Sequence, residues 1–222
     1  MEDQSRAAFF RLEGTLTDRS TTSVAAWMAA HAQEFSDRLS RLGAVALSTP
    51  FRRVLRDAET ATRLSWSGVR GLSADRLHLL GEEHFELFYR GKFSDTGRDF
   101  LQTAKREGLT PVLISDSIVE VVNPVAEHFG IEHVICNRLE MRNGNASGRL
   151  LSPICTGRIS GQLLREMAVD HQWDLLQCRG YGSQETDITL LSALGHPCTV
   201  QPDRSLRAIA KDLDWPIVEA TA

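Results

Sequence analysis

The second half of the sequence alternates short apolar runs with helical patterns, and this alternation most constrains what the chain can fold into. After Gly91, apolar runs at residues 110–115, 133–136, 176–181 and 198–200 are separated by helical patterns at 96–107, 118–129, 158–171, 187–194 and 203–212. Strands that are joined through helices run parallel, because the crossover returns the chain to the same edge of the sheet. We therefore predict an α/β fold with a mostly parallel sheet, and a hairpin at residues 139–151 around Asn143-Gly144.

The first 90 residues combine one strand with a helical block. Residues 7–12 form a short apolar run before Gly14, which predicts a buried strand that ends in a turn. Residues 21–89 contain no segment typical of a strand and carry apolar residues at helical spacing. We expect a Rossmann-like core made of residues 1–18 and 91–222, with residues 19–90 inserted as a helical cap over the carboxyl ends of the strands.

Composition excludes several classes of protein. Of 222 residues, 42% are hydrophobic and 24% are charged, which is typical of a soluble globular chain and not of a disordered one. The net charge of −4 argues against a nucleic-acid partner. No apolar stretch approaches the length that a membrane span needs, so we expect no membrane span and a cytoplasmic protein. The four cysteines have neither zinc-ligand nor disulfide-framework spacing.

Four segments stand where predicted strands end or the next helix begins. In chain order they are FFRLEGTLTD at residues 9–18, LISDS at 113–117, CTGRIS at 155–160 and YGSQETD at 181–187. In this order and spacing they resemble the four motifs of the haloacid dehalogenase (HAD) superfamily, specifically its phosphoserine-phosphatase-like subfamily IB. The resemblance implies a Rossmann-like HAD core and an inserted helical cap of the C1 type.

The first motif departs from that family at the two residues that carry out the chemistry. The family pattern is DxDGT, in which the first aspartate attacks phosphorus and the second serves as general acid and base. Here Arg11 and Glu13 stand at those positions. A guanidinium stays protonated at any working pH, so Arg11 cannot act as a nucleophile. The resemblance therefore implies that this chain cannot use the family's covalent route.

The metal-binding positions of the family are also altered. Mg²⁺ prefers hard oxygen ligands and usually takes carboxylates, which the family supplies from the first and fourth motifs. Arg11 and Ser183 stand at those two positions, and only Asp187 matches a retained acid of the fourth motif. Although the family uses Mg²⁺, we expect no metal site and no cofactor in this chain.

Two other motif positions concern the phosphoryl group. Ser160 stands where the family has the lysine of its third motif, and Arg158 lies two residues before it and partly substitutes for that charge. Ser115 matches the hydroxyl of the second motif that holds a phosphoryl oxygen. If the chain is active, the residues we expect to be catalytic are Glu13, Ser115 and Asp187.

Two interpretations of Arg11 follow. In the first, Arg11 takes over the electrostatic role of the metal and forms a structural ion pair with Glu13, Asp116 or Asp187. In the second, charge-assisted donors at the strand ends bind an anion such as phosphate. The residues of that anion site are Arg11, Gly14, Ser115, Arg158, Ser160 and Ser183.

The sequence supports three classes of function. The leading hypothesis is a catalytically degenerate member of the family, a pseudophosphatase, that acts by binding a small anionic ligand or a protein partner and has no turnover. The alternative is a hydrolase that acts on a small phosphomonoester by a rerouted mechanism, in which Glu13 activates water and Arg11 holds the phosphate. The third is a purely structural or assembly role.

Overall fold

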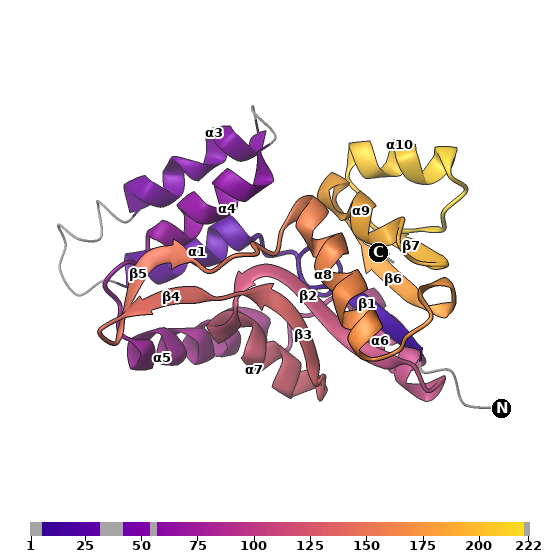
Figure 1. Cartoon of the computed structure of the whole chain (residues 1–222), viewed down its shortest axis with the longest axis horizontal. Helices are drawn as coiled ribbons and strands as arrows, with labels where there is room; N and C mark the ends of the chain where they lie inside the picture. The colour runs from indigo at the N-terminus through magenta and orange to yellow at the C-terminus, as the bar shows by residue number, and fades with distance from the viewer. Residues whose placement is uncertain (1–5, 32–41, 54–56, 220–222) are drawn as a thin grey trace.

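The computed structural model describes residues 6–31, 42–53 and 57–219 of the chain. Its central feature is a sheet of six parallel strands, in the order β3-β2-β1-β6-β7-β8. Figure 1 labels β1, β2, β3, β6 and β7 of this sheet. The strands are β1 (Ala7–Arg11), β2 (Thr110–Ile118), β3 (His133–Asn137), β6 (Arg179–Gly182), β7 (His196–Val200) and β8 (Ile217–Val218). The predicted α/β class and mostly parallel sheet are confirmed.

Helices connect the strands and form the helical insertion between β1 and β2. The insertion contains α1 (Thr21–Ala30), α3 (Ser48–Arg53), α4 (Ala58–Ser67), α5 (Ala74–His84) and a π-helical turn (Phe85–Tyr89). The later helices are α6 (Asp95–Arg106), α7 (Val119–Phe129), α8 (Gly157–Asp170), α9 (Ile188–Leu191) and α10 (Arg204–Asp212), with 3₁₀ turns at Leu175–Gln177 and Glu185–Asp187. The helical insertion is confirmed, whereas the division into residues 1–18 plus 91–222 and 19–90 stays a prediction.

Both faces of the sheet are buried, and β1 shows why its sequence is apolar up to Arg11. Ala8 and Phe10 face one side, where they join a cluster with α6, α7 and the inserted helices. Ala7 and Phe9 face the other side, where they pack with α8 and α9. Successive side chains of a strand point to opposite faces, so a strand that is covered on both sides reads as a continuous apolar run.

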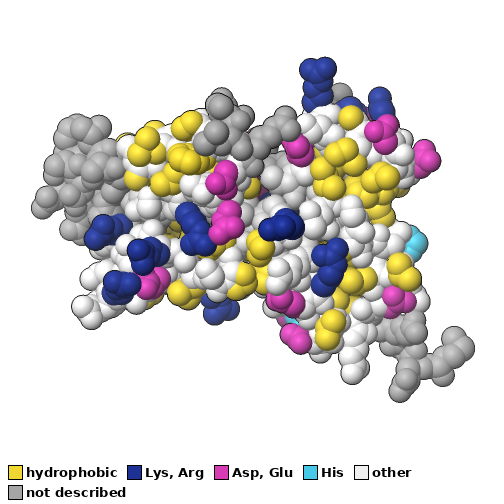
Figure 2. All heavy atoms as spheres, turned by 45° about the horizontal axis from the view of Figure 1, so that its top comes forward, with side chains coloured by type: hydrophobic (Ala, Val, Ile, Leu, Met, Phe, Trp, Pro, Cys, Tyr) yellow, Lys and Arg dark blue, Asp and Glu magenta, His cyan; other side chains and the backbone are white. Residues whose placement is uncertain are grey.

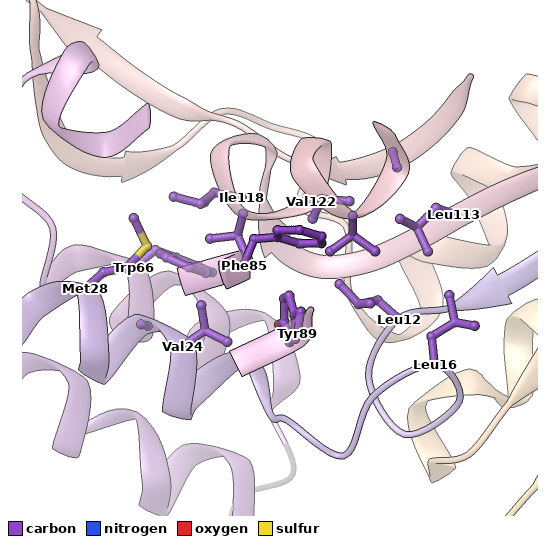
Figure 3. Close-up of a cluster of buried hydrophobic side chains, with 14 of the residues drawn as sticks. Leu12, Leu16, Val24, Met28, Trp66, Phe85, Tyr89, Leu113, Ile118 and Val122 are labelled. Atoms are coloured by element: carbon purple, nitrogen blue, oxygen red, sulfur yellow. The ribbon is translucent and has the colours of Figure 1, made fainter. Parts of the chain in front are cut away.

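The larger of these two clusters is continuous between the sheet and the helical insertion. Figure 3 shows Met28 and Trp66 from α1 and α4 together with Leu113 and Ile118 from β2. All four side chains are fully buried. The insertion is therefore packed onto the core through one shared apolar cluster and not attached only at its two ends.

The predicted hairpin is formed by β4 (Leu139–Arg142) and β5 (Asn145–Leu150), which pair antiparallel. Its turn places Asn143 and Gly144 at positive φ, as the sequence indicated. The hairpin lies beside α4 (Figure 1), and the N–H of Gly71 donates to the carbonyl of Ala146 at 2.7 Å. A segment from the second half of the chain thus extends the helical insertion.

Three local sequence predictions needed correction. The strand predicted at residues 110–115 continues to Ile118, because Ile118 pairs with Asn137 of β3 after a shift in register. The run predicted as extended at residues 176–181 begins instead with the 3₁₀ turn, since Asp174 caps Leu176. The helix predicted at residues 187–194 ends at Leu191, and β8 was not predicted because it has only two residues.

The surface carries both signs of charge. Figure 2 shows basic and acidic side chains interspersed over the visible face, with apolar side chains between them. Within the described residues, no helix is both long enough and apolar enough to cross a membrane.

Candidate functional site

The motif residues meet where the order of strands reverses. From β1 the chain adds β2 and β3 on one side, and later returns to add β6, β7 and β8 on the other. Open α/β sheets place their ligands at such a switch point, beyond the carboxyl ends of the strands. Arg11 is the last residue of β1, Asp116 lies near the end of β2, and Ser183 directly follows β6.

Arg11 is the centre of a buried ionic cluster. Its Nη2 lies 2.8 Å from Oδ1 of Asp116 and 3.6 Å from Oε2 of Glu13. Its Nε lies 3.0 Å from Oδ1 of Asp187, which is an ion pair and not a well-aligned hydrogen bond. All four residues are buried, with 2% of Arg11 and at most 4% of any partner exposed. The predicted pairing of Arg11 is confirmed, and it involves all three carboxylates instead of one.

Glu13 is held by two hydroxyl groups from different parts of the fold. Ser115 Oγ donates to Glu13 Oε1 at 2.6 Å, and Thr21 Oγ1 donates to the same oxygen at 3.1 Å. Ser115 belongs to β2, whereas Thr21 begins α1 of the helical insertion. The insertion therefore supplies a direct contact to the site.

The other two carboxylates are also anchored. Thr156 Oγ1 donates to Asp116 Oδ2 at 2.9 Å. Asp187 Oδ2 accepts from the backbone N–H groups of Ser183 at 2.8 Å and Gln184 at 2.9 Å. Each acid thus uses one oxygen for Arg11 and keeps the other in a separate hydrogen bond, which fixes the geometry around the guanidinium.

Burial sets the protonation behaviour of the cluster. Burial raises the pKa of Glu13 and of Asp187, and nearby Arg11 only partly offsets this effect. Burial lowers the pKa of Arg11, but Asp116, Asp187 and Glu13 outweigh it, so the pKa lies well above the ordinary value. Arg11 therefore stays charged, while Glu13 and Asp187 hold their protons to a higher pH than exposed carboxyls do.

This arrangement predicts that Glu13 makes the fold less stable as pH rises. A carboxyl whose pKa is higher in the folded than in the unfolded state stabilises the fold below the unfolded value, and loses that effect as pH rises through the folded value. Glu13→Gln imitates the protonated form. Its stability relative to the wild type should increase with pH above the ordinary glutamate range, with a slope of up to about 1.4 kcal/mol per pH unit. Urea unfolding from pH 4 to 8 measures the difference.

Glu140→Gln is the matched control for that experiment. Ser147 and Arg142 lower the pKa of Glu140, whereas the pKa of Glu13 is raised. The contribution of Glu140 to stability therefore changes with pH in the opposite direction. Its stability relative to the wild type should not improve as pH rises. A constant difference between Glu13→Gln and the wild type across the range would contradict the raised pKa of Glu13.

The donors proposed for an anion site are largely occupied by the protein itself. Ser115 donates to Glu13, the N–H of Leu12 donates to the carbonyl of Ile114 at 2.9 Å, and the N–H of Gly14 donates to the carbonyl of Thr17 at 2.6 Å. Arg11 faces three carboxylates, and its Nη1 is buried with no hydrogen-bond partner among the described residues. These donors already serve acceptors within the protein, and the anion site around Arg11 stays a prediction.

The remaining predicted site residues lie in different places. Gly14 has φ +82°, and a Cβ there would lie 2.6 Å from Cβ of Ser183, so these two residues are in direct contact. Ser183 Oγ donates to the carbonyl of Gln201 at 3.2 Å. Ser160 is buried with its Oγ 3.7 Å from Cys155 Sγ. Arg158 is exposed. The structure thus brings together Arg11, Glu13, Ser115 and Asp187 in one cluster, whereas Ser160 contacts Cys155 and Arg158 is exposed.

Two hollows flank the cluster. The first, of about 440 Å³, is lined by Gly14, Asp18, Lys92, Ser183 and neighbouring residues. The second, of about 670 Å³, lies between residues 57–59 at the start of α4 and residues 156–159 and 184–189 of the core. Arg158 lines the second hollow together with four acidic residues, which are Asp57, Glu59, Glu185 and Asp203. We call this second hollow the α4–α8 cleft.

A divalent metal does not fit the Arg11 cluster. The guanidinium stands between carboxylates that would otherwise be ligands, at distances of 2.8 to 3.6 Å. Among the described residues, no group of three His, Cys, Asp or Glu side chains has the spacing to hold a metal ion. A cation beside the ligands repels a second cation, so the donor set is unsuited to Mg²⁺.

Sequence reasoning missed three residues of the site. Thr21 and Thr156 fix the carboxylates, and Trp66 donates from Nε1 to the carbonyl of Asp116 at 3.3 Å. Thr156 lies within the CTGRIS segment, so its position in a motif was a usable signal. Thr21 and Trp66 carry no motif signal, because their role depends on how the insertion docks.

The fold and the clustered motifs define a haloacid dehalogenase-like protein. The family model for haloacid dehalogenase-like hydrolases matches residues 8–192, and the chain belongs to this family. A probable phosphatase of Mycobacterium tuberculosis is 32% identical over 120 residues, which cover 54% of this chain and 42% of that protein. A phosphoserine phosphatase of the same organism is 25% identical over 219 residues, covering 97% of this chain and 71% of the relative.

Solved structures show the same fold. A Bordetella pertussis protein of unknown function superposes with a TM-score of 0.85 at 21% identity, over 98% of this chain and all 100% of that one. A substrate-bound phosphoserine phosphatase superposes with a TM-score of 0.71 at 16% identity, over 98% of this chain and 94% of that one. The chain spans less than half the length of the first curated relatives it matches.

Proposed function

We propose that this protein is a catalytically degenerate member of its family, a pseudophosphatase that works by binding a ligand or a protein partner. The observation that carries the proposal is the buried guanidinium of Arg11, which occupies the position of the family's nucleophile and is held by Asp116, Asp187 and Glu13. A protonated arginine has no lone pair to attack phosphorus. Nor does this position offer a carboxylate to a metal.

The charge of the cluster supports the same proposal. One guanidinium faces three acids in a buried setting. A phosphomonoester that entered this space would meet an excess of carboxylate over cation. Phosphoryl transfer depends mainly on positioning and on stabilising negative charge, and this cluster offers little positive charge to a substrate.

The alternative is a phosphatase with a rerouted mechanism that uses Glu13 and Arg11. Its favourable observation is the raised pKa of Glu13, which is a property of general acids and bases. Against it, Glu13 Oε1 already accepts from Ser115 and Thr21, and only 4% of the residue is exposed. A buried and internally bonded carboxyl is poorly placed to activate water, so the degenerate function is better supported.

Phosphate release by the purified protein tests the proposal. Across a panel of phosphomonoesters that includes phosphoserine, with and without Mg²⁺, we expect release no greater than that of the Glu13→Gln variant. We expect this result because position 11 carries no nucleophile. Phosphoserine phosphatase assayed in parallel serves as the positive control.

Turnover in the wild type that disappears in Glu13→Gln would overturn the proposal in favour of the rerouted phosphatase. The folded state of that variant must be checked by circular dichroism, because Glu13 is part of the buried cluster. Arg63→Gln is the matched control, since Arg63 pairs with Glu59 on the exposed surface. It should leave any activity unchanged.

Binding in this proposal uses the α4–α8 cleft. The cleft is open to solvent and lies between the insertion and the core. The residues that follow Ser183 form part of its lining. Arg158 is its basic residue, and Asp57, Glu59, Glu185 and Asp203 are its acidic ones. This balance favours a protein partner over a small anionic ligand, because an anion is repelled by more charges than attract it. A cytoplasmic location is part of the same proposal.

A further inference from the structure

The acids around Arg11 have the geometry of a binding site for a planar cation. They approach two different nitrogens of the guanidinium, with Asp116 and Glu13 at Nη2 and Asp187 at Nε. They come from three separate parts of the chain, namely the end of β2, the loop after β1 and the 3₁₀ turn after β6. Each has its own anchor in Thr156, in the hydroxyls around Glu13, or in backbone N–H groups.

These anchors do not depend on Arg11. Thr156 holds Asp116, Ser115 and Thr21 hold Glu13, and the N–H groups of residues 183 and 184 hold Asp187. We therefore expect the acids to remain oriented toward the same point when the arginine side chain is removed. Fixed carboxylates around a common point, buried from water, attract a cation much more strongly than exposed ones do.

We infer that Glu13, Asp116 and Asp187 form a guanidinium-binding site whose permanent occupant is the side chain of Arg11. The ligand class of this site is a planar organic cation, and neither a phosphate nor a divalent metal belongs to it. Nη1 of Arg11 and Oε2 of Glu13 are buried and have no hydrogen-bond partner in the part of the chain that the structure describes, so the cluster has one unpaired donor and one unpaired acceptor. This inference does not rest on the proposed function, because it concerns what fills the site and not whether the protein turns over a substrate.

Geometry separates the guanidinium class from the metal class. A guanidinium presents several N–H donors in one plane, and the acids here contact two of its nitrogens, Nη2 and Nε. Magnesium needs octahedral oxygen ligands at about 2.0–2.1 Å from one point. The three acids are spaced around a planar guanidinium, and no group of metal ligands is present among the described residues. The acids therefore suit a guanidinium better than a magnesium ion.

Rescue of an Arg11→Ala variant by a small cation tests the inference. The variant is refolded from urea in the presence of methylguanidinium chloride, so that the ligand reaches the buried site during folding. We expect methylguanidinium to raise the thermal unfolding midpoint of Arg11→Ala by about 5–10 °C at roughly 100 times its dissociation constant. The wild type should show no such rise, because Arg11 already fills the site.

Three further probes and one variant make the result specific. Sodium chloride at equal ionic strength, MgCl₂ and sodium phosphate should each fail to stabilise Arg11→Ala in the way that methylguanidinium does. Arg158→Ala removes an exposed arginine from the α4–α8 cleft, and should show no response to methylguanidinium.

Stabilisation of Arg11→Ala by Mg²⁺ in place of methylguanidinium would overturn the inference and make the acids a metal site. Stabilisation by phosphate would overturn it in favour of an anion site. If Arg11→Ala does not fold in any of these solutions, the inference also fails, because it requires an external guanidinium to substitute for the lost side chain. None of these results depends on phosphatase activity, so failure here is distinct from failure of the proposed function.

Discussion

Replacing Arg11 with methionine should lower the free energy of unfolding by about 3–5 kcal/mol, because it leaves three buried acids without their cation. Methionine keeps much of the side-chain volume, so the loss of stability measures the effect of removing the charge and not the effect of a cavity. Urea unfolding at pH 7, followed by tryptophan fluorescence, measures the difference. Arg11→Met should also become relatively more stable at lower pH, where the acids take up protons.

The surface pair of Arg63 and Glu59 provides the control. These residues are 2.8 Å apart at i,i+4 spacing on α4, and more than two fifths of each side chain is exposed. Arg63→Met should cost no more than about 0.5 kcal/mol, because exposed pairs of this kind contribute little. A cost below about 1 kcal/mol for Arg11→Met would show that the buried cluster contributes no more than a surface pair does.

Gly81→Ala should destabilise the protein by about 3 kcal/mol. Gly81 lies where α5 of the insertion crosses α7 of the core, and a Cβ at this position would stand 1.9 Å from the carbonyl oxygen of Glu120. Backbone cannot move away as a flexible side chain does, so the two helices must separate. The gain in helix propensity from glycine to alanine, about 1 kcal/mol, is too small to offset this clash.

Gly43→Ala is the matched control because Gly43 sits in a helical stretch, and a Cβ added there would have no neighbouring atom of the described residues within 4 Å. That substitution should be neutral or stabilising by up to about 1 kcal/mol. Thermal or urea unfolding of both variants gives the comparison. Equal stability of the two variants would mean that α5 and α7 are not in close backbone contact at Gly81.

The parallel sheet could be predicted from the sequence because the alternation of strands and helices is a local pattern. Residues 7–12 and 110–115 read as buried strands because they are mostly apolar, and the structure pairs Phe10 with Leu113 as neighbours. The position of each strand in the sheet depends on the direction in which each helical crossover moves the chain. The two-residue β8 is too short to leave a pattern, so it was missed.

The site could be predicted in part, for a similar reason. Arg11, Ser115 and Asp187 were expected to lie close together since the carboxyl ends of parallel strands share an edge. How many acids would contact Arg11 was not predictable, because that depends on side-chain directions. Thr21 and Trp66 enter the site from the insertion, and nothing in a linear sequence tells which face of the insertion docks.

The hairpin of β4 and β5 has a consequence for chimeras between this protein and other members of its family. It belongs to the core half of the chain, yet Leu139, Ala146 and Leu150 share an apolar cluster with the inserted helices. A chimera that takes only residues 19–90 from another family member would join a foreign surface to this native hairpin. We expect such a graft to keep its packing only when residues 139–150 travel with the insertion, because the hairpin and the inserted helices form one packing unit built from two separate stretches of the chain.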